Sequence, residues 1–144
     1  MVESVKESHA PILARLASRL WDSHGTEALE GEILAAIQGG NTVFFIKYAT
    51  NLPVGFAQCS LRKDYVEGTN SSPVGYLEGI FVEAAHRNKG YGRELIQACQ
   101  AWARQMGCKE FASDCQLDNE ESLRFHRAVG FEEANRIICF HMNL

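Results

Sequence analysis

The spacing of apolar residues predicts two helices at the start of the chain. An apolar stripe with steps of three and four residues indicates a helix over residues 9–22. The members of the stripe are Ile12, Leu13, Leu16, Leu20 and Trp21. A second amphipathic segment predicts a helix over residues 26–38, with Thr26 as its cap and Gly39-Gly40 as its stop.

The next segments change from helical spacing to the composition of strands. Residues 42–48 and 54–61 are rich in β-branched and aromatic side chains, and residues 50–53 between them favour a turn. We therefore expect an antiparallel hairpin. Residues 62–73 have no apolar period and contain Gly, Asn, Ser and Pro, which is typical of a surface loop.

Strands and helices then alternate to the end of the chain. The expected elements are a strand over 74–82, a helix after residues 87–92 that stops at Gly107, a strand over 110–114, a helix capped by Asp118 that ends at Gly130, and a strand over 137–142. This order predicts an α/β fold in which a mixed sheet carries helices on both faces. With 144 residues and no linker, residues 1–144 are expected to form one domain.

Charge and cysteine content narrow the classes of function. The 18 acidic and 14 basic residues give a net charge of −4, which disfavours nucleic-acid binding and suits a cationic partner. The five cysteines include no Cys-x-x-Cys pair, so we expect neither a disulfide framework nor a metal site. Because the start of the chain lacks an apolar export signal and no apolar run approaches the roughly 20 residues of a membrane span, we expect a cytoplasmic protein.

The segment Arg87-Asn88-Lys89-Gly90-Tyr91-Gly92 lies between a predicted strand and a long predicted helix. Glycines let the main chain approach a ligand, and the free N–H groups of the first helical turn can hold a pyrophosphate. Arg87 and Lys89 add positive charge there. A plain turn is the alternative, since the segment matches neither Gly-x-Gly-x-x-Gly nor a P-loop.

Two motifs in register decide between these interpretations. RNKGYG follows a strand, and Asn119 opens a later helix that ends in Gly130-Phe131. This pattern resembles the GNAT acetyltransferase superfamily, whose members bind acetyl-CoA on a mostly antiparallel sheet that splays at the cofactor. Four further segments are similar to the bacterial aminoglycoside 6'-N-acetyltransferases, and the resemblance spans nearly the whole chain. They are SLRKDYVEGTNSSPVGYLEGIFV, AHR, EFASDCQLDN and HRAVGFEEANR.

The resemblance implies direct acetyl transfer from acetyl-CoA to a primary amine of an aminoglycoside. Main-chain groups of Ile80, Phe81 and Val82 would hold the acetyl and pantetheine portion, with the Ile80 N–H as the oxyanion donor. Asn119 would contact the pantetheine arm. The residues implied for the pyrophosphate are Arg87, Asn88, Lys89, Gly90, Tyr91, Gly92 and Arg93.

Two carboxylates are the candidates for the amine side. Glu78 lies two residues before Ile80, so the strand period predicts that both side chains share a face. A salt-bridged strand residue is the alternative for Glu78, and a loop-capping aspartate is the alternative for Asp114. The resemblance favours the substrate-binding interpretation for both carboxylates, and each would bind the cationic substrate by charge-assisted hydrogen bonds. We expect Asp114 to be the general base that frees the attacking amine.

The resemblance also implies aromatic contacts to the sugar rings from Trp21 and Tyr65, although Trp21 continues an apolar stripe and would otherwise be core. Two positions depart from the related enzymes. Asn135 stands where they often carry an acid, which weakens one expected contact to the substrate. His126 stands where many members carry a Tyr acid beside the cofactor thiolate, so His126 either donates that proton or is hydrogen-bonded structure.

Three further expectations come from the resemblance. The chain is expected to be a homodimer to which the apolar strand 137–142 contributes. One alternative function is acetylation of another amine, such as a polyamine or a protein N-terminus. Another is a module that binds acyl-CoA without catalysis.

Overall fold

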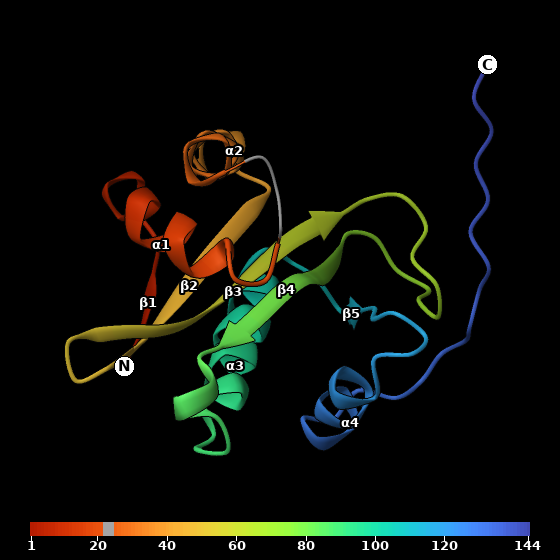
Figure 1. Cartoon of the computed structure of the whole chain (residues 1–144). Helices are drawn as coiled ribbons and strands as arrows, with labels where there is room; N and C mark the ends of the chain where they lie inside the picture. The colour runs from red at the N-terminus through yellow and green to blue at the C-terminus, as the bar shows by residue number, and fades with distance from the viewer. Residues whose placement is uncertain (22–24) are drawn as a thin grey trace.

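A sheet with the strand order β1-β2-β3-β4-β5 forms the centre of the protein (Figure 1). The structure is a computed structural model and describes residues 1–21 and 25–144. The strands are β1 (Val2–Ser4), β2 (Thr42–Ala49), β3 (Leu52–Arg62), β4 (Val74–Val82) and β5 (Phe111–Ser113). Neighbours from β1 to β4 pair antiparallel, and β5 runs parallel to β4. The prediction of a mixed, mostly antiparallel sheet is confirmed.

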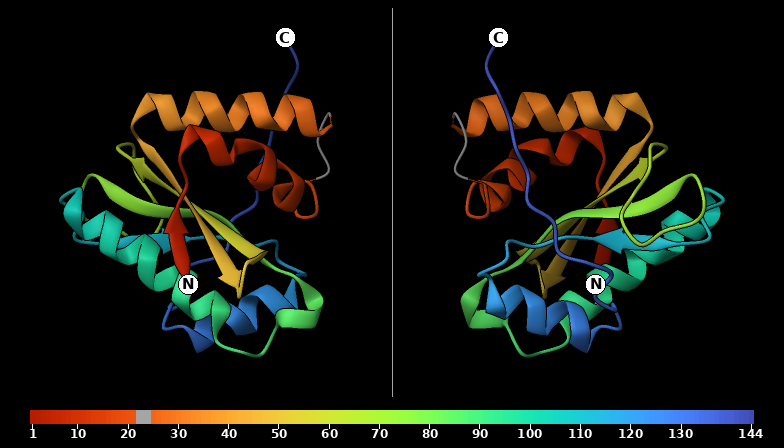
Figure 2. Two further views of the ribbon diagram at one scale, coloured as in Figure 1. Left: turned by 90° about the vertical axis from the view of Figure 1, so that its left-hand side faces the viewer. Right: turned by 90° about the vertical axis from the view of Figure 1, so that its right-hand side faces the viewer.

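Helices cover both faces of this sheet, as predicted (Figure 2). On one face lie α1 (Ala10–Ala17) and α2 (Thr26–Gly39), and on the other lie α3 (Tyr91–Gln105) and α4 (Glu120–Ala128). Two short 3-10 turns, η1 (Glu7–His9) and η2 (Ala84–His86), precede α1 and α3. Among the described residues, no helix combines the length and the apolar character needed to cross a bilayer.

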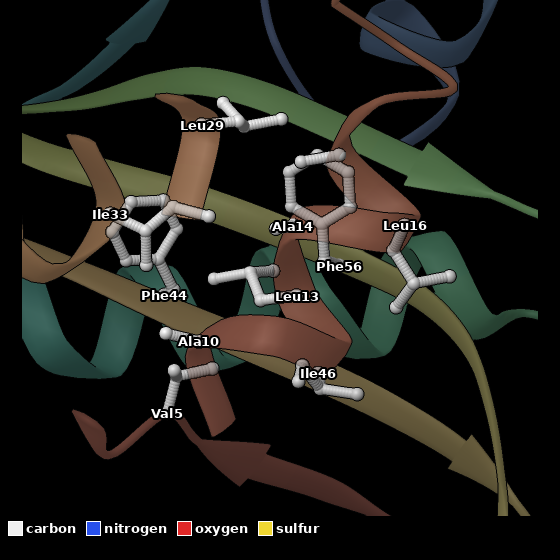
Figure 3. Packing of buried hydrophobic residues seen from close by; sticks show 11 residues of the cluster. Val5, Ala10, Leu13, Ala14, Leu16, Leu29, Ile33, Phe44, Ile46 and Phe56 are labelled. Atoms are coloured by element: carbon white, nitrogen blue, oxygen red, sulfur yellow. The ribbon is translucent and has the colours of Figure 1, made fainter. Parts of the chain in front are cut away.

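Successive side chains of β3 point to opposite faces of the sheet, so this strand contributes residues to both layers of the core. Phe56 is fully buried and packs with Leu13 of α1, Ile33 of α2 and Phe44 of β2 (Figure 3). The next residue, Ala57, points to the other face, as the period of a strand requires. It belongs to a cluster that includes Cys59, Leu77, Leu95, Ile96 and Cys99. β3 thus ties the two helical layers together.

β4 contains one residue more than its partner strand. Gln58 of β3 lies opposite Gly79, whereas the next residue, Cys59, lies opposite Leu77. Glu78 is therefore the additional residue of a β-bulge. A bulge bends the strand and shifts by one residue the alternation of its side chains between the two faces of the sheet. On the other edge of β4, pairing with β5 ends at Leu77↔Ser113. The two strands separate beyond this point, which is the expected splay.

The predicted helix over 9–22 is too long. α1 ends at Ala17, and after Ser18 the N–H groups of Arg19 and Leu20 donate to the carbonyls three positions earlier, at 3.2 and 3.0 Å. These bonds tighten the chain into a turn, so the apolar stripe continues in space without a continuous α-helix. Residue 22 lies outside the described residues.

The caps of two helices differ from the prediction by one residue. Thr26 is the first helical residue of α2, and Gly25 takes the cap position with a φ of 104°. Asn119 caps α4 in place of Asp118, because its side chain accepts a hydrogen bond from the Ser122 N–H at 3.1 Å. The ends of α2, α3 and α4 lie within about two residues of Gly39-Gly40, Gly107 and Gly130.

The prediction of a strand over residues 137–142 is wrong. The segment belongs to no helix or strand, and it leads away from the sheet (Figure 1). Ile138 is 80% exposed and Phe140 is 90% exposed. An extended, β-branched segment forms a strand only beside a partner that shares its hydrogen bonds. Conversely, β1 was not expected from the sequence, and it forms because β2 offers it such an edge.

We predict that Phe56→Ala lowers the free energy of unfolding by about 3–5 kcal/mol, because it opens a cavity where the sheet meets α1 and α2. Thermal or urea unfolding measures the loss. Leu52→Ala is the matched control, since Leu52 is 57% exposed and its truncation leaves no cavity. Equal effects of the two substitutions would contradict this description of the core.

Candidate active site

A cleft of about 1160 Å³ opens where β5 ends, between the loop after β3, α4 and the C-terminal segment. Four residues expected at the site line it, namely Tyr65, Asp114, His126 and Asn135. The C-terminal segment meets the loop at the rim, because Asn135 Nδ2 donates to Glu67 Oε2 at 2.6 Å. Segments far apart in the sequence therefore form one site.

A chain of polar contacts runs from the bulge of β4 into this cleft. Glu78 Oε1 accepts hydrogen bonds from Ser60 Oγ at 2.8 Å and from Arg62 Nε at 2.9 Å, and Arg62 Nη2 donates to Glu78 Oε2 at 2.9 Å. The Arg62 guanidinium carbon lies 3.5 Å from the centre of the Tyr76 ring. The Tyr76 hydroxyl in turn donates to Asp114 Oδ2. The two carboxylates are thus connected through Arg62 and Tyr76.

The prediction that Glu78 and Ile80 share a face is wrong. Ile80 packs against the cluster on the α3 face, whereas Glu78 bonds Arg62, which stacks on Tyr76 at the opposite face. The physical reason is the bulge, because its additional residue shifts the period of two between these positions. Within the described residues, the cleft lining includes Asp114 but neither Glu78 nor Ile80.

Trp21 belongs both to the core and to the surroundings of the bulge. Its ring meets Phe56 edge to face, with centroids 5.4 Å apart. The same ring lies so close to Gly79 that a Cβ at this position would overlap it. Trp21 also lines a separate cavity of about 310 Å³ under α2, together with Leu29 and Ile33. The turn after α1 therefore places an aromatic ring directly on β4, beside Glu78.

The start of α3 has the geometry of an anion cradle. Gly90 caps the helix with a φ of 82°, a left-handed conformation that glycine adopts without strain. A Cβ on Gly92 would lie 2.7 Å from the Phe125 ring, so a larger residue would separate α3 from α4. The N–H groups of the first turn point out of the helix, as a pyrophosphate site requires.

A buried lysine anchors this helix to the sheet. Lys47 of β2 is 5% exposed, forms an ion pair with Glu94, and lies 4.4 Å from the centre of the Tyr91 ring. Its hydrogen bond to Glu94 raises the pKa of the Lys47 ammonium above its usual value. The first turn of α3 is thereby tied to β2.

The basic residues of the cradle differ in their contacts. Arg87 Nε donates to the Val82 carbonyl at 2.8 Å, and Arg93 Nη2 donates to the Ala128 carbonyl at 2.7 Å. These two side chains tie the loop to β4 and α4. Asn88 and Lys89 are exposed at its tip, where they can meet a ligand.

His126 and Asn119 both lie in hydrogen-bond networks at α4. His126 Nδ1 lies 2.7 Å from the Ser122 carbonyl, so Nδ1 carries a proton, since a carbonyl can only accept. Nε2 lies 2.8 Å from Ser113 Oγ at the end of β5. Asn119 uses its side-chain oxygen for the cap of α4, which leaves its amide nitrogen outside that cap.

Sequence reasoning missed Arg62, Tyr76 and Lys47. One signal was available, because Tyr76 and Glu78 lie two residues apart in a strand and so present polar atoms near one another. Their connection through Arg62 required the pairing of β3 with β4, which the sequence pattern does not specify.

Comparison with known proteins agrees with this geometry. The model of the acetyltransferase (GNAT) family matches residues 10–131. The chain belongs to the GNAT acetyltransferase family. Within this family, the aminoglycoside N(6')-acetyltransferase type 1 of Salmonella enteritidis is 37% identical, over 96% of each chain. The corresponding enzyme of Stenotrophomonas maltophilia is 39% identical, over 99% of this chain and 93% of that one.

Solved structures of GNAT enzymes show the same fold. AAC(6')-Iy in complex with the bisubstrate analogue CoA-S-monomethyl-acetylneamine superposes with a TM-score of 0.95 and 36% identity, over 100% of this chain and 98% of that one. AAC(6')-Ih from Acinetobacter baumannii gives a TM-score of 0.93 and 34% identity, over 100% and 98% of the two chains. The splayed sheet and the anion cradle thus belong to a GNAT acetyltransferase.

We predict that Gly79→Ala displaces the Trp21 ring from β4, because the added methyl group would overlap it. Tryptophan fluorescence in a Trp102→Phe background, where Trp21 is the sole emitter, should shift to longer wavelength. Gly39→Ala is the matched control, since a Cβ there meets nothing within 4 Å. An unchanged spectrum in Gly79→Ala would contradict the contact.

Proposed function

We propose that this protein transfers the acetyl group of acetyl-CoA to the 6'-amine of aminoglycosides of the kanamycin and tobramycin type. The observation that carries the proposal is the near-full-length similarity to AAC(6')-Iy, a structure solved with an analogue that joins CoA to acetylneamine. The chemistry of the chain suits both parts of such an analogue, since acidic side chains line the cleft and the start of α3 has the geometry of an anion cradle. Antibiotic resistance would be the biological consequence.

Acetyl-CoA would lie along the edge of β4 that β5 leaves free. Main-chain groups of Ile80, Phe81 and Val82 would pair with the acetyl and pantetheine portion, and the Ile80 N–H would face the thioester oxygen. The pyrophosphate would rest on residues 87–93, where the first turn of α3 supplies N–H groups. The amide nitrogen of Asn119 would reach the pantetheine arm, and His126 would lie near the sulfur.

The aminoglycoside would occupy the cleft. Acidic residues outnumber basic ones in its lining, which favours a polycation. The acidic residues are Glu67, Glu110, Asp114, Glu132 and Glu133, and the basic residues are Arg62, Arg127 and Arg136. Tyr65, which is 75% exposed, would cover a sugar ring, and Asn135 would contribute a polar contact without charge. Trp21 would close the far side at Gly79, where Glu78, paired with Arg62, would offer a carboxylate oxygen as a hydrogen-bond acceptor.

The chemistry requires an uncharged amine beside the thioester. Asp114 would accept one proton from the substrate ammonium, and the freed nitrogen would attack the carbonyl carbon. The negative oxygen of the tetrahedral intermediate would be stabilised by the Ile80 N–H. The attack forms the C–N bond, and collapse of the intermediate re-forms the carbonyl and breaks the C–S bond. The leaving thiolate takes up a proton from the nitrogen, so the products are the amide, CoA and a proton released from Asp114.

The cytoplasm, where acetyl-CoA is made, is the compartment we propose for the reaction. All five cysteines have free thiols, including the exposed Cys115 and Cys139, and a reducing compartment keeps such thiols unpaired.

The function is tested by following thiol release from acetyl-CoA with kanamycin, tobramycin, spermidine and a peptide in separate reactions. We expect release with the two aminoglycosides and an acetyl group on the 6'-nitrogen of each product, located by NMR. Release with spermidine or the peptide alone would assign another amine as the substrate. Binding of acetyl-CoA without thiol release from any amine would indicate a module without catalysis.

We predict that Asp114→Asn lowers kcat for kanamycin by about 10²-fold or more, because it removes the general base. The KM for acetyl-CoA should stay within about twofold, since the carboxylate acts on the amine. Asp118→Asn is the matched control, at an exposed aspartate of the loop that follows the site. A kcat for Asp114→Asn equal to that of the control would remove Asp114 as the base.

We also propose that the protein is a homodimer in which residues 137–142 pack on a second copy. Five large apolar side chains of the C-terminal segment are more than half exposed, which is unusual for a protein that stays monomeric. They are Ile137, Ile138, Phe140, Met142 and Leu144. The extended segment leads away from its own sheet, so an identical second chain can receive it by an equivalent exchange (Figure 1).

Ile138→Asp should weaken the dimer by at least tenfold in Kd, because it places a charge in an apolar contact. Analytical ultracentrifugation over a range of concentrations measures this change. Leu52→Asp, at an exposed leucine of the β2–β3 hairpin, serves as the control and should stay dimeric. A monomer at all concentrations of the unaltered chain would refute the dimer.

A further inference from the structure

The contacts between Arg62, Tyr76 and Asp114 assign a function to two residues outside the predicted site. We propose that Tyr76 is a positioning residue for the base Asp114, and that Arg62 fixes Tyr76 by stacking on its ring while it holds Glu78. The inference rests on the proposed function, because it assumes that Asp114 accepts a proton from the amine.

Tyr76 is held on two sides. Its side chain is 6% exposed, and it packs with Val66 and Val74 in a cluster under the loop after β3. The Arg62 guanidinium covers the ring at 3.5 Å, and both of its hydrogen bonds to Glu78 measure 2.9 Å. A planar guanidinium that stacks on a ring and binds a carboxylate in two places has little freedom to move. The direction of the Tyr76 hydroxyl is therefore fixed.

The hydroxyl acts as the donor in its bond to Asp114. Burial raises the pKa of the Tyr76 phenol, and the hydrogen bond to Asp114 raises it further. The phenol consequently keeps its proton at neutral pH and donates it to Oδ2. Within residues 1–21 and 25–144, Oδ1 of Asp114 accepts no hydrogen bond. Oδ1 is therefore the oxygen that would accept the proton of the substrate ammonium.

Asp114 needs such support because it lies outside regular structure. β5 ends at Ser113, and Asp114 is exposed in the following segment. A carboxylate on a free loop would sample several rotamers, and few of them would face the amine. The bond from Tyr76 selects one rotamer and connects it to β4, the strand that we propose holds the thioester. Base and thioester would therefore share a rigid support.

Other charged or titratable groups face the same cleft and contribute to its pH dependence. They are Arg62 and Tyr65 from β3 and its loop, Glu67 and Glu110 at the rim, Cys115 after β5, His126 and Arg127 of α4, and Glu132, Glu133, Arg136 and Cys139 of the C-terminal segment. Glu78 lies behind Arg62. All of these remain in Tyr76→Phe, so a difference between that variant and the unaltered chain reports on the Tyr76 hydroxyl alone.

The first experiment measures kcat/KM for kanamycin against pH in Tyr76→Phe. Tyr76→Phe removes a hydrogen-bond donor to the Asp114 carboxylate, and this loss disfavours the charged form. The acid limb of the curve of kcat/KM against pH should therefore move up by about one pH unit. The KM for acetyl-CoA should stay within about twofold. Tyr48→Phe, at a half-buried tyrosine of β2, is the matched control. An acid limb that stays in place would overturn the proposal, whether or not the rate falls at every pH.

Double variants show whether Tyr76 acts through Asp114. In an Asp114→Asn background, adding Tyr76→Phe should change the residual kcat by less than about twofold, since the partner of the hydroxyl is already altered. Arg62→Lys keeps the charge but loses the flat stacking surface, and it should reproduce the shift of the acid limb in part. Arg15→Lys, at an exposed position of α1, is its control. Independent, multiplicative effects of Tyr76→Phe and Asp114→Asn would contradict the proposal.

A measurement without turnover separates this proposal from the proposed function. Labelling with 3-fluorotyrosine gives four ¹⁹F signals, assigned by Tyr→Phe variants, and fluorination lowers the phenol pKa and so brings the titration closer to neutral pH. Asp114→Asn should move the titration midpoint of the Tyr76 signal to lower pH and leave the other three in place. A Tyr76 midpoint that does not move would overturn the link even if the enzyme is active. If it moves but no aminoglycoside is acetylated, the contact stands and the substrate assignment fails.

Discussion

The separation of β4 from β5 is the constraint on which the rest of the structure depends. Their parallel ladder has only three pairs, from Gly75↔Phe111 to Leu77↔Ser113. Because main-chain groups require partners, the free edge of β4 beyond Leu77 is suited to a ligand that can replace a strand. The same separation ends β5 at the residue before Asp114. The end of the β4–β5 pairing thus leaves an edge of β4 free for a ligand and places the Asp114 carboxylate directly after β5.

Close packing holds α3 against β4 and against α4. A Cβ on Gly75 would overlap Ala103 of α3, so this helix lies directly against β4 while the ladder is still formed. Gly92 allows the same closeness between α3 and the Phe125 ring of α4. Interiors packed in this way have low compressibility, which favours a fixed arrangement of α3 and α4 near the point where β4 and β5 separate.

The sequence predicted local elements well and their partners poorly. The strand 74–82 was correct at both ends, because its β-branched and aromatic residues begin directly after Pro73 and end before Glu83. Gly79 within the strand is a local signal of the bulge, and the strict period of two ignored it, so it predicted the wrong face for Glu78 relative to Ile80. The error at 137–142 has another origin, since propensity identifies an extended segment but not the strand that would pair with it. The motif residues 87–92 needed no distant partner, and their place at the start of α3 was predicted correctly.

Arg62 is a cation in the lining of a cleft that we propose binds a polycation. The β-bulge at Glu78 explains why this cation is there. Glu78 is half-buried there, and a carboxylate removed from water requires a partner of opposite charge. Arg62 supplies it, so Glu78 and Arg62 together carry no net charge. Of the two carboxylates connected through Arg62 and Tyr76, Glu78 is neutralised by its ion pair, which leaves Asp114 as the stronger attraction for a substrate ammonium at the end of β5. The ion pair that stabilises the bulge would therefore also direct the amine to the base.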